Sequence, residues 1–127
     1  MIVVDASAAL SGLLNPGPAR DALAVERLHA PHLIDSEVAS GLRRQVRATS
    51  IGSEDAGAAL DVWLRLGMAR HPALGLLRRM WELRENLSAY DATYVALAEA
   101  LGCPLLTADA RLAGATGVRC PVTTVPR

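Results

Sequence analysis

The chain has 127 residues and a formal net charge of zero, and all 13 of its basic residues are arginines. This length suits one domain spanning residues 1–127, and neutrality argues against strong, indiscriminate nucleic-acid binding. The chain has two cysteines, Cys103 and Cys120, which are too few for a disulfide framework. One disulfide is possible, but reduced thiols are favoured. No signal-peptide pattern and no membrane-length apolar run is present, so we expect a soluble, cytoplasmic protein.

Short apolar runs alternate with segments of helical periodicity along the chain. The predicted strands, in chain order, cover Ile2–Val4, His29–Pro31, Gly67–Arg70, Pro104–Thr107 and Val122–Val125. The predicted helices cover Ala6–Leu14, Pro18–Leu28, Leu33–Arg47, Ser53–Leu66, Ala73–Asn86, Ser88–Leu101 and Ala108–Ala115. Because strands alternate with helices and the strands are apolar on both faces, the pattern predicts an α/β fold with a parallel sheet.

Four acidic residues occupy related positions in this scheme. Asp5 follows the first strand, Asp109 follows the strand that ends at Thr107, and Glu37 and Asp91 lie near the starts of two helices. Ligands of open parallel sheets bind outside the carboxyl ends of the strands, and helix starts face the same crevice. We therefore expect these four carboxylates to converge on one pocket.

A cluster of carboxylates implies a particular chemistry. Neighbouring carboxylates repel one another, and a bound divalent cation removes that repulsion. Oxygen ligands without histidine or thiolate select Mg²⁺ or Mn²⁺ over Zn²⁺. Such an ion activates water and stabilises charge on a scissile phosphate, so hydrolysis of a phosphodiester is the natural reaction.

Each acidic residue also has a purely structural interpretation. Asp5 and Asp109 are suited to capping the helices that follow them, and Asp91 forms a capping box with Ser88. Glu37 alone is typical of an exposed helix face. The spacing of the four residues does not decide between these interpretations.

Local motifs carry more information than the spacing. The segments in question, in chain order, are Ile2-Val-Val-Asp5-Ala-Ser7, Asp35-Ser-Glu37-Val38 with Leu42-Arg43-Arg44, Leu87-Ser-Ala-Tyr90-Asp91-Ala92 with Tyr94-Val-Ala-Leu97-Ala98, and Leu106-Thr107-Ala-Asp109-Ala-Arg111-Leu112. In these segments the chain resembles PIN-domain proteins, in particular the VapC-type toxins of bacterial toxin–antitoxin modules. The resemblance extends over essentially the whole chain.

The resemblance implies a three-layer α/β/α sandwich with a small parallel sheet of four to five strands. It also implies a Mg²⁺-dependent ribonuclease site, in which Mn²⁺ can replace Mg²⁺. Asp5 and Asp91 match the principal metal ligands, and Asp109 matches a further acidic residue near the metal. Glu37 matches a glutamate that binds metal through water or orients the nucleophile. The hydroxyls of Ser7 and Thr107 match groups that position the carboxylates, which completes the set of site residues that the family pattern provides.

The family also implies partners. Its toxins cleave RNA, which inhibits growth or translation, and are held inactive by a cognate VapB-type antitoxin whose C-terminal segment lies near the active site. They commonly form homodimers. The target RNA, the antitoxin and the number of metal ions are not specified by this sequence.

The remaining arginines and the tryptophans leave alternatives open. Arg43, Arg44, Arg47 and Arg111 either contact RNA phosphates or pair with acidic residues on solvated helix faces. Phe is absent, so the core must be largely aliphatic. The two tryptophans, Trp63 and Trp81, follow helical apolar stripes, which favours packing in the core or in a dimer over base stacking.

Three other functions deserve comparison with the nuclease. A phosphoacceptor domain also places aspartates at strand ends, but it needs a lysine and this chain has none. A non-catalytic RNA- or protein-binding module on the same scaffold has no use for a complete carboxylate set. A structure-specific DNA nuclease usually needs long helical insertions, for which the chain is too short.

Overall fold

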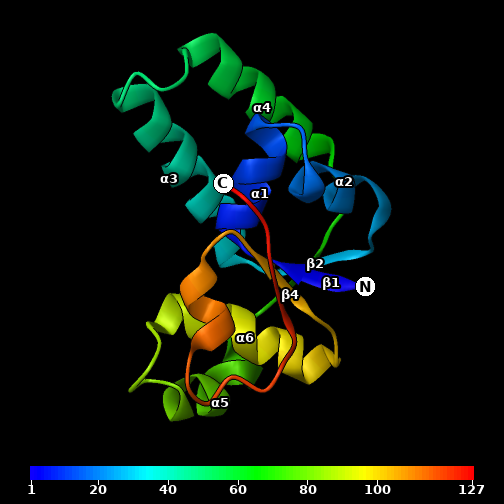
Figure 1. Ribbon diagram of the computed structural model, residues 1–127, viewed down its shortest axis with the longest axis vertical. Coiled ribbons are helices and arrows are strands. Elements are labelled where there is room, and N and C mark those ends of the chain that lie inside the picture. The colour runs from blue at the N-terminus through cyan, green and yellow to red at the C-terminus, as the bar shows by residue number, and fades with distance from the viewer.

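A five-stranded parallel sheet lies at the centre of the computed structural model, which describes residues 1–127 (Figure 1). The strands are β1 (Ile2–Val4), β2 (Leu28–Pro31), β3 (Ala69–His71), β4 (Leu105–Thr107) and β5 (Val122–Thr124). They are ordered β3-β2-β1-β4-β5, and all neighbouring pairs are parallel. The expected parallel sheet is therefore confirmed.

The chain begins in the middle of this sheet and extends it in both directions. β2 and β3 lie on one side of β1, while β4 and β5 lie on the other. The strand order thus reverses between β1 and β4, and such a switch point is where open α/β sheets bind ligands. Val4 is in register with Leu106, so Asp5 and Thr107 leave the sheet side by side.

Helices cover both faces of the sheet and complete three layers (Figure 1). They are α1 (Ala6–Leu14), α2 (Pro18–Val25), α3 (Leu33–Arg47), α4 (Ser53–Arg65), α5 (Leu77–Glu82) and α6 (Ala89–Leu101), with short 3₁₀ helices η1 (Leu74–Leu76) and η2 (Ala110–Gly114). On one face α1 contacts β4 and carries α2, α3 and α4, whereas α6 contacts β1 and β2 and carries α5. The three-layer α/β/α prediction is confirmed.

The core is aliphatic, as the absence of Phe requires. Val3, Val4 and Leu105 of the central strands are completely buried. Every residue from Ala92 to Ala98 is buried too, because α6 lies between the sheet and α5. None of the helices combines the length and the apolar character needed to cross a bilayer.

Several predicted boundaries are wrong, each for a local reason. The second helix ends at Val25, not Leu28, because Leu28 pairs with Ile2 and begins β2. The third strand is shifted to Ala69–His71, in register with β2. The helix expected over 73–86 divides into η1 and the short α5, and the segment after β4 is a 3₁₀ helix.

The two tryptophans have different environments. Trp63 of α4 is 3% exposed, and its indole N–H donates to Asp35 at 2.8 Å. Trp81 is 68% exposed, so of the two packing roles predicted for it, packing in the core is wrong and packing in a dimer stays a prediction. The short α5 turns Leu83 inward and leaves Trp81 outside, where the guanidinium carbon of Arg84 lies 4.6 Å from its ring centroid.

Close packing of α1 on α2 gives a test of this fold. A Cβ added at Gly12 would lie 2.5 Å from Leu23 Cδ1 and 3.1 Å from the backbone nitrogen of Arg20. We predict that Gly12→Ala lowers the free energy of unfolding by about 1–3 kcal/mol, the usual cost of overpacking. Urea denaturation followed by circular dichroism measures this change.

Gly57 of α4 provides the matched control, because a Cβ there meets no atom within 4 Å. Gly57→Ala should raise the free energy of unfolding by about 0.5–1 kcal/mol, since alanine favours an exposed helix over glycine. Equal responses at the two glycines would contradict the packing of α1 against α2.

Candidate active site

A cleft of about 790 Å³ opens between α1, α3 and α6, beside the switch point of the sheet. All four predicted acidic residues, Asp5, Glu37, Asp91 and Asp109, line it. Asp5 and Asp109 follow the ends of strands, Asp91 lies in the first turn of α6, and Glu37 lies one turn into α3. The expected convergence of these side chains is therefore present, whereas their catalytic role stays a prediction.

Asp5 has the most constrained carboxylate of the four. It is 6% exposed. Its Oδ1 accepts hydrogen bonds from the backbone N–H of Ala8 at 2.9 Å and from Ser7 Oγ at 2.7 Å. Its Oδ2 accepts from Thr107 Oγ1 at 2.5 Å. Burial raises the pKa of Asp5, and these hydrogen bonds oppose the rise. The hydrogen bonds orient the carboxylate, which forms no ion pair.

Ser7 and Thr107 join this carboxylate to the loop after β4. Ser7 Oγ accepts from the N–H of Ala108 at 2.9 Å, and Thr107 Oγ1 accepts from the N–H of Asp109 at 3.0 Å. The hydroxyl contacts predicted for both residues are thus present. They fix the backbone that carries Asp109 relative to Asp5.

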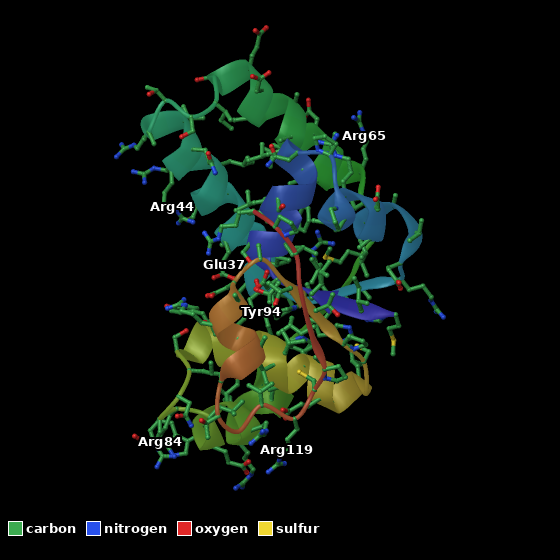
Figure 2. All side chains as sticks on the ribbon, viewed as in Figure 1. Glu37, Arg44, Arg65, Arg84, Tyr94 and Arg119 are labelled. Atoms are coloured by element: carbon green, nitrogen blue, oxygen red, sulfur yellow. The ribbon has the colours of Figure 1, made fainter.

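Glu37 has a partner that sequence reasoning missed. The phenol of Tyr94, on α6, donates to Glu37 Oε1 at 2.5 Å, and Figure 2 shows the two side chains meeting between α3 and α6. The sequence shows Tyr94 only as part of a motif segment, yet a buried tyrosine needs a hydrogen-bond partner, and this need is the signal that could have revealed the contact. Burial raises the pKa of Glu37, the Tyr94 bond lowers it, and the charges of Asp5 and Asp91 raise it.

Asp91 and Asp109 differ in their electrostatic environment. Ser88 caps α6 by accepting from the N–H of Asp91, which leaves the carboxylate of Asp91 free to face the cleft. Burial and then the charge of Asp109 raise the pKa of Asp91. Asp109 caps η2 and forms an ion pair with Arg111 at 2.6 Å, which lowers its pKa. For Arg111, pairing with an acidic residue is therefore the arrangement found.

The donor set bears on a possible metal. No group of three or more His, Cys, Asp or Glu side chains is arranged to hold a metal ion. Asp5, Glu37 and Asp91, however, are carboxylates that line one cleft and form no ion pair. Mg²⁺ typically takes only one or two carboxylates, with waters and substrate phosphates completing its shell. The residues present therefore fit such an ion, while Asp109 is already neutralised by Arg111.

Together, the sheet order and the cleft define a small α/β protein whose acidic site lies at the switch point of a parallel sheet. The family model for the PIN domain matches residues 2–117, and the chain belongs to this family. It is 60% identical to "VapC ribonuclease Mb0985" of Mycobacterium bovis, and the match covers 100% of each chain.

Two solved structures share the fold. The first is VapC20 of Mycobacterium tuberculosis, described as a Sarcin-Ricin loop cleaving toxin, with a TM-score of 0.61 and 23% identity over 94% of this chain and 99% of that one. The second is VapBC2 of Rickettsia felis bound to a DNA fragment from its promoter, with a TM-score of 0.70 and 13% identity over 98% of each chain.

The raised pKa of Asp91 predicts how stability depends on pH. A carboxyl whose pKa is higher in the folded chain binds more protons when folded, so its contribution to stability falls as the pH rises through the interval above its unfolded value, 3.8. Asp109 and Asp35, whose pKa values arginines lower, act in the opposite direction. We therefore predict that the melting temperature of Asp91→Asn, minus that of the native chain, increases as the pH rises from about 4 to neutral.

Thermal unfolding without divalent cations, followed at a series of pH values, measures this difference. Asp61 of α4 is an exposed aspartate outside the cleft, and Asp61→Asn serves as the control. It provides the comparison against which the pH trend of Asp91→Asn is judged. A constant or falling difference for Asp91→Asn would contradict the raised pKa of the Asp91 carboxyl.

Proposed function

We propose that this protein is a Mg²⁺-dependent endoribonuclease and the toxin component of a VapBC-type toxin–antitoxin module. The observation that carries the proposal is the cleft with three carboxylates that form no ion pair, at the switch point of the sheet. The 60% identical relative that is named a ribonuclease supports the reaction class. Phosphodiester hydrolysis is the chemistry that such a donor set serves best.

Asp5 and Asp91 are the residues that would hold Mg²⁺, with Mn²⁺ as a substitute, and Asp109 would assist from its position beside Arg111. When bound, the ion supplies charge stabilisation at the scissile phosphate and lowers the pKa of water. The three hydrogen bonds on Asp5 fix its oxygens before any ligand arrives. Such preorganisation favours tight and geometrically defined binding.

Glu37 has the properties of a residue that orients the attacking water and accepts its proton. Its carboxylate is half-buried, and its pKa is raised towards the range in which a general base works well. The Tyr94 hydroxyl holds one oxygen of the carboxylate, which leaves the other for water. In this mechanism Tyr94 is a positioning residue, because it acts through Glu37.

The same relatives support a proposal for the biological setting. VapBC2 of Rickettsia felis was solved with promoter DNA. For the present chain we propose a VapB-type antitoxin as partner, RNA as substrate, a homodimer as assembly and the cytoplasm as location. Cleavage of RNA would then inhibit growth or translation until the antitoxin blocks the cleft.

A cleavage assay tests the reaction. We expect the purified protein to cut RNA in Mg²⁺ and to stop in EDTA. Asp5→Asn and Asp91→Asn should each lower the rate by at least about 100-fold, since even the outer partners of metal ligands are commonly worth 10–100-fold. Asp61→Asn, which alters an exposed carboxylate outside the cleft, should cleave as the native chain does.

The outcomes of these tests discriminate among the alternative functions. Cleavage that persists in EDTA and in both site variants would refute the metal site. RNA binding without any cleavage would instead indicate the non-catalytic module. Growth arrest on expression, relieved by the protein encoded beside it, would support the toxin assignment.

Tyr94 is tested by a double-mutant cycle with Glu37. Tyr94→Phe should lower kcat about 10-fold with little change in KM, because it frees the Glu37 carboxylate. The combination Tyr94→Phe with Glu37→Gln should fall within about twofold of Glu37→Gln alone, since residues that act as one unit are not additive. Additive losses in kcat would show that Tyr94 has only a structural role.

A further inference from the structure

The cleft extends well beyond the four carboxylates. It continues between α1 and α3 towards Asn15 and Ser50, at the far ends of both helices. The lining of this extension mixes polar side chains, including Ser11, Ser40 and Gln45, with apolar ones such as Leu10 and Leu14. Its polar groups can form hydrogen bonds with the backbone of a nucleic-acid strand.

Arg44 faces this groove from α3. It lies seven residues after Glu37, two turns along the same helix face, and both residues line the cleft. The two positions are about 10 Å apart along the helix axis, or about three steps of a stacked nucleic-acid strand. Arg44 is exposed and makes no ion pair, and Figure 2 shows it farther along α3 than Glu37.

Arg127 reaches the same cleft from a different part of the chain. After β5 the backbone N–H of Val125 donates to the carbonyl of Thr107 at 2.8 Å, and Val125 is buried. Ser11 Oγ then donates to the carbonyl of Pro126 at 2.6 Å, so the segment is fixed against α1 (Figure 1). Arg127 is thereby placed at the cleft, exposed and without an ion pair.

We propose that Arg44 and Arg127 bind the phosphates of the RNA strand on either wall of the cleft and so position the scissile bond over the carboxylates. This inference rests on the proposed function and adds the substrate-binding residues to it. Arginine suits the task because its planar guanidinium binds phosphate oxygens in pairs. Two local cations also explain how a chain of zero net charge can hold RNA at one place.

The neighbouring arginines do not share this geometry. Arg43 and Arg47 line a separate groove of about 400 Å³ between α3 and α4, where Leu42, Val46 and Leu60 make most of the surface apolar. Arg111 is engaged with Asp109. Arg43 is therefore a matched control for Arg44, since it is adjacent on the same helix, exposed and unpaired, yet faces away from the cleft.

Binding of a fluorescein-labelled oligouridine, measured by fluorescence anisotropy in EDTA over a series of KCl concentrations, tests the proposal. Arg44→Ala and Arg127→Ala should each weaken binding about tenfold, as expected for the loss of a charged hydrogen bond. Each should also reduce the slope of log affinity against log salt by about 0.7. Arg43→Ala should change neither quantity, and Arg44→Lys should keep the slope.

Several results would overturn the proposal. These are equal losses in Arg43→Ala and Arg44→Ala, unchanged binding in Arg44→Ala, or no salt-dependent binding by the native chain. Loss of antitoxin inhibition in Arg44→Ala with RNA binding intact would assign the groove to the protein partner instead. Because binding is measured without cleavage, a chain that binds RNA as expected but never cuts it would refute the proposed function and leave this inference standing.

Discussion

The site depends on one buried carboxylate. Asp5 follows the central strand, and its three hydrogen bonds join two parts of the chain: the first turn of α1, through Ser7 and Ala8, and the end of β4, through Thr107. Since β1 and β4 border the switch point, this contact determines how the two halves of the sheet present their carboxyl ends. This network also positions its surroundings, because neighbouring groups bond to it or lie next to it. The parts positioned in this way are the loop with Asp109, the cleft wall on α1 and the segment after β5.

The same arrangement has an electrostatic cost. Burial and mutual repulsion raise the pKa values of Asp5, Glu37 and Asp91, so the ionised site opposes folding at neutral pH. Two acidic residues outside the cleft form ion pairs with arginine: Asp35 with Arg70, and Glu99 with Arg79. Asp5, Glu37 and Asp91 line one cleft without any ion pair, so a cation bound there would offset the cost of ionising them. Asp109, held by Arg111, is the one member already neutralised, which separates its role from that of Asp5 and Asp91.

Much of this organisation was predictable because it is local. Apolar, β-branched runs identified the strands, and the caps at Asp5 and Ser88 are read from neighbouring residues. What could not be predicted depends on contacts distant in sequence. The partner of Tyr94 lies 57 residues away on another helix, and Arg127 reaches the cleft only because β5 pairs beside β4. The position of Trp81 matches a helical apolar stripe, but periodicity does not reveal that α5 is short and leaves this side chain exposed.

For three of the four acids, a position at the start of a helix does not exclude a place in the cleft. Asp5 caps α1 with one oxygen, while its other oxygen accepts a hydrogen bond from Thr107. The cap of α6 fixes the backbone of Asp91, whose carboxylate lines the cleft. Asp109 caps η2. A helix start fixes the backbone of its first turn, so a carboxylate attached there loses little further freedom on binding a ligand. Capping is therefore a means by which this fold orients its acidic groups. Glu37 has no cap to orient it, and the hydroxyl of Tyr94 performs that task from the opposite wall.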